Sequence, residues 1–338
     1  MEWNFKNVKE QPFEIGGILH PDKNYGEYYR MDASKKEIYS DPNRALGHHT
    51  SGGTVRFVTD ADSICIKNTL REAVVGMNHF THRGVWGLDV LVGSGKDRKY
   101  CGKLMQTFAD STEANENVVD LPAGENEVLI FMPLYAGIKD IEIGLPEGAS
   151  LKAPAPRSFG PIAFYGSSIT QGGCASRAGC AFHNIVCRHF DADCINLGFS
   201  GSAFGEQSIA EYMATREIAL FVMDYVFNSR SLEELQETHY PFYKTFRDAH
   251  PGVPVLMCTH PYCWPTADID IKRIETVKAT YDRAIAEGDK DVYFLDGREY
   301  FPAEMSDLCF VDYLHPNDLG MYFMAKKMIE KIEGIINK

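Results

Sequence analysis

The segment PIAFYGSSITQGG, residues 161–173, lies where the chain changes from one sequence pattern to another. Its apolar first part predicts a buried strand, and the glycine turn behind it carries two serines. Beyond it, short apolar runs alternate with stretches of helical periodicity, which is typical of an α/β domain with a doubly wound, parallel five-stranded sheet, here over residues 156–338. The expected strands are 162–165, 194–197, 220–225, 253–258 and 292–295, and the expected helices are 179–190, 205–215, 231–249, 268–287 and 319–336.

The residues before this segment follow a different pattern. Apolar and polar residues alternate in short runs bounded by Gly, Asn and Asp, and helical periodicity is almost absent. This predicts an antiparallel β-sandwich or jelly-roll domain over residues 1–155. The proline-rich segment from Pro146 to Pro161 predicts a linker or a surface strand between the two domains. The expected strands of the sandwich are 54–58, 63–67, 88–92, 127–131 and 138–143.

Composition narrows the range of partners. The 338-residue chain has a formal net charge of -13 and no cluster of Lys and Arg, so no nucleic-acid partner is expected. No apolar segment is long enough for a membrane span or a signal sequence, so no membrane partner is expected and the chain is predicted to be cytoplasmic. Nine cysteines, an odd number, predict reduced thiols rather than a disulfide framework. Assembly into a homo-oligomer is left open.

Polar residues follow four of the five expected parallel strands. In an open parallel sheet the ligand crevice lies beyond the carboxyl ends of the strands, so these loops are expected to meet at one edge. They read Gly166-Ser167-Ser168, Asn196-Leu-Gly-Phe-Ser-Gly201, Asp224-Tyr-Val-Phe-Asn228 and Asp312-Tyr-Leu-His315.

These loops carry what acyl transfer to a serine needs. A serine hydroxyl requires a nearby base, and the base requires a group that fixes its tautomer. We therefore expect Ser168 as nucleophile, His315 as base and Asp312 as its orienting carboxylate. The backbone N–H of Ser168, the N–H of Gly201 and the Asn228 amide are the expected oxyanion donors. The neighbouring Ser167 competes as nucleophile, but its expected role is to orient the turn.

The four motifs GSSIT, NLGFSG, FNS and DYLHP resemble the four blocks of the SGNH (GDSL-type) hydrolase superfamily, in the family's order. That resemblance implies a flavodoxin-like catalytic domain and the same roles for Ser168, Gly201, Asn228, Asp312 and His315. The usual G-D-S and G-x-N-D sequences are altered here, as in one subgroup with an N-terminal β-sandwich marked by a G-x-D-L-Y motif. The segment GLDVL, residues 87–91, keeps the Gly and Asp of that motif, and FMPLY, residues 131–135, resembles a second segment of the same domain.

The resemblance implies a serine esterase that acts without a metal or organic cofactor through an acyl-enzyme. Relatives with a β-sandwich remove O-acetyl groups from carbohydrates, so a small-molecule or oligosaccharide ester is the expected substrate. Two alternatives stay open. One is an acyl-thioesterase or lysophospholipase, and the other is a carbohydrate-binding protein whose hydrolase half has lost activity.

A few further residues invite a functional interpretation. Tyr262 and Trp264 follow the fourth expected parallel strand and either stack on a sugar or pack against the sandwich, whereas Arg177 either holds its loop or reaches the substrate. His48-His49 is expected to be an exposed loop pair. One set with metal-ligand chemistry is disfavoured because its spacing matches no common zinc motif and three of its members share one face of an expected helix. That set is Cys174, Cys180, His183 and Cys187.

Overall fold

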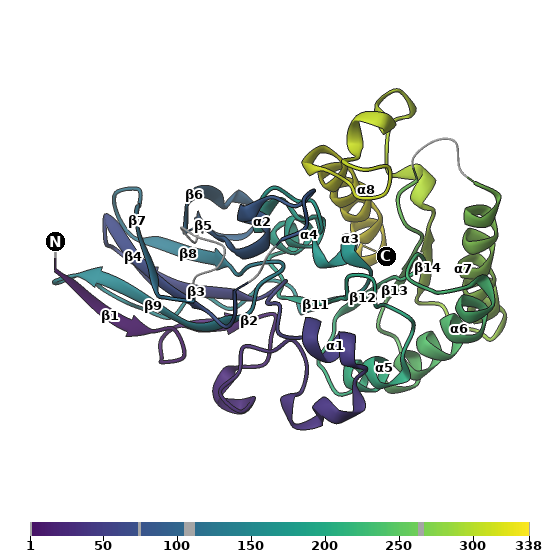
Figure 1. Cartoon of the computed structure of the whole chain (residues 1–338), viewed down its shortest axis with the longest axis horizontal. Coiled ribbons are helices and arrows are strands. Elements are labelled where there is room, and N and C mark those ends of the chain that lie inside the picture. Colours follow the sequence, from purple (N-terminus) through teal and green to yellow (C-terminus); the bar gives the residue numbers. More distant parts are fainter. Residues whose placement is uncertain (1, 74–75, 105–111, 263–266, 338) are drawn as a thin grey trace.

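The computed structural model describes residues 2–73, 76–104, 112–262 and 267–337. It shows an antiparallel β-sandwich formed by the N-terminal half and a parallel sheet with flanking helices formed by the C-terminal half (Figure 1). This confirms the fold class predicted from the sequence. In the described part of the chain, no helix combines the length and the apolar character that a membrane span requires.

The sandwich consists of two antiparallel sheets. One has the order β1-β9-β4-β7 and the other the order β2-β3-β8-β5-β6. Apolar residues from both sheets, such as Ile64 and Ile66 of β4 and Val128 and Ile130 of β8, are fully buried in one hydrophobic cluster. The strands are β1 (Trp3–Asn7), β2 (Glu14–Gly16), β3 (Thr54–Thr59), β4 (Ser63–Leu70), β5 (Leu88–Val92), β6 (Lys99–Leu104), β7 (Asn115–Asp120), β8 (Asn126–Phe131) and β9 (Ile138–Pro146).

The parallel sheet has the order β11-β10-β12-β13-β14, so the first strand of this half lies inside the sheet. Every residue of β10, β11 and β12 is buried, because helices cover both faces, and this explains the continuous apolar runs of the sequence. The elements are β10 (Ile162–Gly166), α4 (Phe182–Phe190), β11 (Cys194–Gly198), α5 (Gln207–Ala214), β12 (Leu220–Asp224), α6 (Leu232–Ala249), β13 (Val255–Cys258), α7 (Asp268–Ala286), β14 (Val292–Leu295) and α8 (Asp318–Ile336).

Alternate residues of the strands face the two helical layers. Phe164 and Val222 lie in the cluster that contains apolar residues of α4 and α8. Tyr165 and Phe221 lie in the cluster with α5, α6 and α7. The carboxyl ends of the strands therefore lie between the two layers of helices. The polar loops noted in the sequence follow the strands at this edge of the sheet.

Several short elements were not predicted. They are the strands β1, β2, β6 and β7 and the helices α1 (Asp41–Leu46), α2 (His82–Trp86) and α3 (Ser168–Gln171). β1 and β7 are the outer strands of their sheet; β1 alternates apolar and polar residues over only five positions, and β7 is mostly polar with one buried residue. The helices have four to six residues, too few for a periodic pattern.

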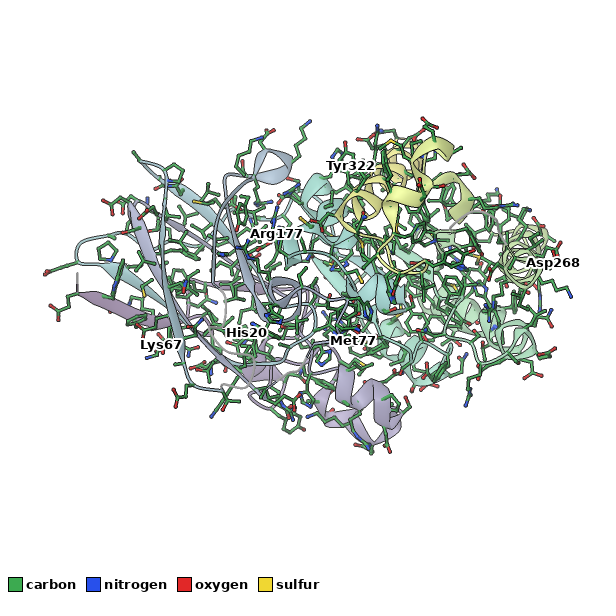
Figure 2. The ribbon with its side chains drawn as sticks, turned by 45° about the horizontal axis from the view of Figure 1, so that its top comes forward. His20, Lys67, Met77, Arg177, Asp268 and Tyr322 are labelled. Atoms are coloured by element: carbon green, nitrogen blue, oxygen red, sulfur yellow. The ribbon has the colours of Figure 1, made fainter. Side chains whose placement is uncertain are left out.

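The sandwich and the parallel-sheet domain pack against each other through both polar and apolar contacts, and Arg177 lies at this boundary (Figure 2). Arg30 is fully buried there and donates hydrogen bonds to the carbonyl oxygens of Asn196 and Gly198 at the end of β11. Arg98 is also buried and pairs with Asp191 behind α4 at 2.7 Å. The change of architecture falls between β9 and β10, and a domain division at residues 155/156 remains a prediction.

The expectation for His48-His49 was wrong. His48 is 6% exposed and packs against Tyr29, and His49 Nδ1 accepts a hydrogen bond from the Gln171 side chain at 2.9 Å. Burial lowers the pKa of His49 to about 3, so its imidazole is neutral at physiological pH. The pair belongs to the boundary because the sandwich docks on α3, and a local sequence pattern does not show that contact.

Candidate active site

Ser168 stands at the start of α3, directly behind the carboxyl end of β10. A Cβ atom at Gly166 would lie 2.2 Å from Thr170 Oγ1 and 2.5 Å from the Asp224 carbonyl oxygen, so only glycine fits this turn. Ser167 caps α3, since its Oγ accepts a hydrogen bond from the Ile169 N–H at 3.2 Å. The structure thus gives Ser167 the turn-orienting position expected for it and leaves the Ser168 hydroxyl for another partner.

That partner is His315. Ser168 Oγ lies 2.8 Å from His315 Nε2, and His315 Nδ1 lies 2.8 Å from Asp312 Oδ2. Residues 147 positions apart in the sequence are therefore joined in one line of hydrogen bonds. The Asp312 carboxylate also accepts the backbone N–H groups of Leu314 at 3.1 Å and His315 at 2.7 Å, which fixes the D-x-x-H turn around it.

The charge of Asp312 fixes the tautomer of His315. Partial burial alone would raise the pKa of Asp312, but the hydrogen bonds from the His315 backbone and ring hold it below the usual value. Asp312 is therefore a carboxylate at neutral pH and accepts the proton on Nδ1. Nε2 is left with a lone pair that faces the Ser168 hydroxyl, the arrangement needed for general-base activation.

The two other expected oxyanion residues lie on loops behind the strands that flank β10. Gly201 follows β11, has a left-handed φ of +67° and has open space where a Cβ would stand. Asn228 follows β12, and its Oδ1 accepts the Ala203 N–H at 3.4 Å. This contact ties the two loops together.

The sandwich supplies a wall that the sequence reasoning missed. Tyr135 donates its hydroxyl to the Ser168 carbonyl oxygen at 3.0 Å, and its ring contacts that of Phe80 with centroids 4.6 Å apart. Phe80 in turn lies nearly perpendicular to the His315 ring, with centroids 6.1 Å apart, and His79 Nε2 lies 3.8 Å from Asp312 Oδ2. Tyr135 ends the FMPLY segment, which was the one available signal; the segment around His79 has none.

Arg177 holds its loop. Its guanidinium pairs with Asp89 Oδ2 at 2.7 Å, and the same oxygen accepts the Gly179 N–H at 2.8 Å. Asp89 is the acidic residue of the GLDVL segment and is 3% exposed. The Asp of that motif therefore anchors the loop that leads away from Ser168 to the sandwich.

The structure says little about the two aromatic residues expected to bind substrate, Tyr262 and Trp264. Tyr262 is 8% exposed and packs with its ring centroid 3.9 Å from that of His260. Trp264 lies outside the described residues. Contact of either residue with a substrate remains a prediction.

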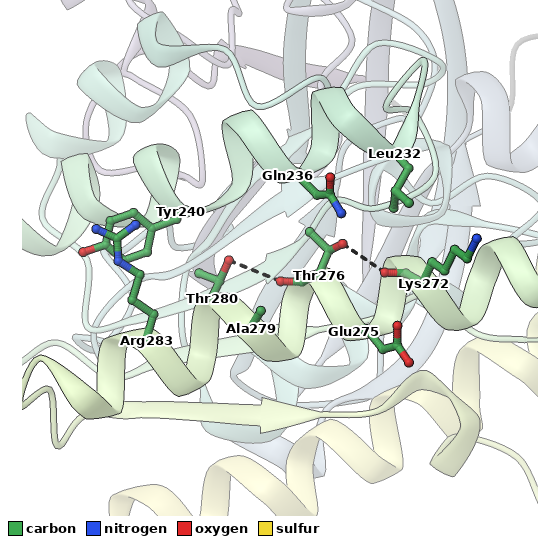
Figure 3. Close-up of a pocket in the computed structure, with 9 residues that line it drawn as sticks. All are labelled: Leu232, Gln236, Tyr240, Lys272, Glu275, Thr276, Ala279, Thr280 and Arg283. Carbon is green, nitrogen blue, oxygen red and sulfur yellow. Dashed lines mark hydrogen bonds between the residues drawn. The ribbon is translucent and has the colours of Figure 1, made fainter.

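A cluster of potential metal ligands lies beside the catalytic residues, and a separate groove lies away from them along the chain. In the described part of the chain, the histidine, cysteine and carboxylate groups that cluster closely enough for a metal ion are His79, Cys174 and His315, a different set from the one weighed on the sequence. A groove of about 550 Å³ lies between α6 and α7 (Figure 3). It contains none of the residues expected in catalysis, and its Thr276 and Thr280 hydroxyls donate hydrogen bonds to carbonyl oxygens of their own helix.

Comparisons with known proteins identify the family of both halves of the chain. Residues 160–333 match the GDSL-like lipase/acylhydrolase family, and residues 3–151 match GxDLY, the N-terminal domain of SGNH-hydrolase-type esterases. A search among curated proteins finds no significant match.

Solved structures show the same fold over the whole chain. A crystal structure described as a GDSL-like lipase from Bacteroides ovatus ATCC 8483 is 24% identical, with a TM-score of 0.88 over 99% of this chain and 98% of that one. The salicylyl-acyltransferase SsfX3 from a tetracycline biosynthetic pathway is 18% identical, with a TM-score of 0.83 over 98% and 97%. A family two carbohydrate esterase from Clostridium thermocellum, in complex with cellohexaose, is 15% identical, with a TM-score of 0.63 over 85% and 93%.

At these identities the structural likenesses establish the fold, whereas the family match covers more than half of the sequence and includes all four motif loops. The chain belongs to the GDSL-like lipase/acylhydrolase family and is an esterase-type hydrolase.

Proposed function

We propose that this protein is a serine esterase that removes short acyl groups, above all O-acetyl groups, from carbohydrates. The observation that carries the proposal is the continuous line from Ser168 Oγ to His315 Nε2 and from His315 Nδ1 to Asp312 Oδ2, with 2.8 Å at each step. These are the distances at which a base can take the proton of a nucleophile.

The reaction proceeds in two stages. Ser168 Oγ attacks the ester carbonyl carbon while its proton passes to His315 Nε2, and the tetrahedral intermediate collapses when His315 returns that proton to the leaving alcohol. Water then attacks the acyl group on Ser168, with His315 again taking a proton, and the free acid leaves. Asp312 stabilises the imidazolium in both stages, since its oxygens already hold the ring and the backbone of His315.

The oxyanion is stabilised by donors from three loops. In this proposal these are the N–H groups of Ser168 and Gly201 and the Asn228 amide. Loss of one such donor costs about 100- to 1000-fold in kcat in serine hydrolases, so Asn228→Ala is expected to lower kcat within that range. The contact between Asn228 and the Ala203 N–H supports this placement, because it fixes the side chain between the loops behind β11 and β12.

Two observations support a short acyl group on a carbohydrate. The ring of Phe80 from the sandwich stands beside His315, so the sandwich restricts the space around the triad. Family two carbohydrate esterases, one of them in complex with cellohexaose, are among the structures with this arrangement of sandwich and parallel sheet.

A substrate panel tests the proposal. Acetylated mono- and oligosaccharides are incubated with the wild type and with Ser168→Ala, and the loss of acetyl groups is followed by mass spectrometry. We expect deacetylation by the wild type alone. A series of p-nitrophenyl esters separates the rivals, since faster hydrolysis of acyl chains of eight or more carbons would contradict an acetylesterase and favour a lysophospholipase-type enzyme. Equal rates for wild type and Ser168→Ala would contradict the esterase mechanism itself.

A further inference from the structure

We propose that His79, Cys174 and His315 form a binding site for Zn²⁺, through which this metal reversibly blocks the catalytic serine. Their ligand atoms lie within 4.8 Å of one another; Cys174 is buried and the His315 side chain is 11% exposed. The three residues come from three separate segments, the sandwich loop before α2, the loop behind α3 and the turn before α8. Their meeting is therefore a property of the fold.

Two of the three donor atoms make no hydrogen bond with the described residues. His79 Nδ1 lies 3.2 Å from Asn78 Oδ1, whereas its Nε2 is buried without a hydrogen-bond partner and faces the Asp312 carboxylate at 3.8 Å. The thiol of Cys174 is 6% exposed and makes no hydrogen bond with the described residues. A lone pair and a thiol that the fold leaves unused therefore lie next to the catalytic imidazole.

The donor set selects the kind of metal. Imidazole and thiolate ligands favour Zn²⁺ and related transition metals over Mg²⁺ and Ca²⁺, which prefer oxygen. On binding, the Cys174 thiol releases its proton to solvent and becomes a thiolate. This charge and the Asp312 carboxylate together offset the two positive charges of the ion, so the bound site is close to neutral.

The geometry requires a small closure. In a tetrahedral zinc site with Zn–N bonds of about 2.0 Å and Zn–S bonds of about 2.3 Å, ligand atoms lie about 3.3 to 3.6 Å apart. The donors must therefore approach by about 1 Å. His79 is the member able to move, since its side chain is 23% exposed and its Nε2 makes no hydrogen bond that would have to break.

Ligation of His315 stops catalysis. Both ring nitrogens of His315 are in use, Nε2 by Ser168 and Nδ1 by Asp312. A zinc ion on either nitrogen removes the lone pair that activates Ser168 or the carboxylate that orients the ring. The inhibition rests on the proposed esterase function, but the binding of the metal does not.

Two measurements test the site. The first is the Zn²⁺ concentration that halves hydrolysis of p-nitrophenyl acetate by the wild type, Cys174→Ser and His79→Asn. Neither side chain takes or gives a proton in the proposed reaction, and each value is expressed relative to the variant's own activity without metal. We expect each variant to need at least about ten-fold more Zn²⁺, because even loss of an outer partner of a metal ligand weakens binding about 10- to 100-fold. Cys180→Ser and His82→Asn, a thiol and an imidazole close by in sequence, are the matched controls and are expected to behave like the wild type.

The second measurement does not depend on activity. Co²⁺ added to the full chain is expected to give a thiolate-to-cobalt charge-transfer band and the strong visible absorption of tetrahedral cobalt, both lost in Cys174→Ser. A wild-type spectrum without the thiolate band, or equal zinc sensitivity in all four variants, would overturn the proposal. If no ester is hydrolysed but the cobalt spectrum depends on Cys174, the proposed function fails and the metal site stands.

Discussion

The two regions that meet at Ser168 differ in the partners that they give to buried carboxylates. At the boundary with the sandwich, the buried carboxylates are in ion pairs: Asp89 with Arg177 at 2.7 Å and Asp191 with Arg98 at 2.7 Å. Under the catalytic edge of the parallel sheet, Asp224 is 4% exposed, receives only the Thr170 hydroxyl at 3.0 Å and has no ion-pair partner in the described part of the chain.

This difference corresponds to the role of each region in the proposed reaction. The parallel sheet presents the groups proposed to react, Ser168 and His315, on loops at its edge. The sandwich presents groups that hold these loops, such as Tyr135 on the Ser168 carbonyl oxygen and Asp89 on Arg177. Removing a reacting group should therefore abolish activity with little effect on folding, and removing a supporting group should do the reverse.

The largest effect is expected on the reacting side. Ser168→Ala should lower kcat for p-nitrophenyl acetate by about 10⁴-fold or more, because removing the nucleophile of a triad leaves only the residual catalysis of binding and the oxyanion donors. Its melting temperature should stay close to that of the wild type. Ser167→Ala is the matched control: loss of a helix cap costs about 1 kcal/mol of stability, and most activity should remain. If the two variants exchange these outcomes, Ser167 is the nucleophile.

On the supporting side, the strongest expected loss is one of stability. Asp89→Ala leaves the Arg177 guanidinium and the Gly179 N–H without their shared partner. Breaking a buried ion pair by removing one partner costs about 3 to 5 kcal/mol, and the partial exposure of Arg177 places this case at about 3 kcal/mol or below. Urea unfolding measures the change, with the exposed Asp97→Ala as control. Equal stability of both variants would show that the boundary does not depend on this pair.

Because Asp224 has no ion-pair partner in the described part of the chain, it should make the free energy of unfolding depend on pH. Burial raises its pKa to about 7, against an unfolded value of about 3.9, so the folded protein keeps a proton that the unfolded chain loses. Stability from this group is present in full below about pH 4 and is lost as the pH rises to about 7. In Asp224→Asn, which cannot ionise, the fall in unfolding free energy between pH 5 and pH 8 should shrink by about 2 to 3 kcal/mol. Denaturant titrations at both pH values measure it, and Asp307→Asn, on the surface, should match the wild type.

The sequence predicts the parallel sheet well, because strands covered on both faces leave unbroken apolar runs such as residues 220–224. The five inner strands of the sandwich were also visible as alternating runs. Its remaining strands were not predicted; β1, for example, alternates over only five residues, and β7 has a single buried residue.

Within the site, Ser168, Asp312 and His315 could be predicted because each is tied to a local motif behind a strand. His79 and Phe80 could not, since they reach the triad only through the docking of the sandwich, more than 80 residues away from Ser168 in the sequence. Asp89 and Tyr135 could be predicted in part. Their segments were recognisable, but their partners, Arg177 and the Ser168 carbonyl oxygen, depend on the same docking.

The smallest expected effect tests whether a supporting group of the sandwich, the Tyr135 hydroxyl, influences kcat. Tyr135→Phe removes the hydroxyl that donates to the Ser168 carbonyl oxygen, an oxygen that also accepts the N–H groups of Gly172 and Gly173. Because these two bonds remain, the loss should amount to about 1 kcal/mol of stability, the usual net value of one hydrogen bond. If part of that loss displaces Ser168 Oγ from His315, kcat should fall by up to about ten-fold while KM stays constant. Urea unfolding and steady-state kinetics measure both, with the exposed Tyr322→Phe as control. Loss of stability without change in kcat would show that the sandwich supports the fold of α3 and leaves the position of its serine to the parallel sheet.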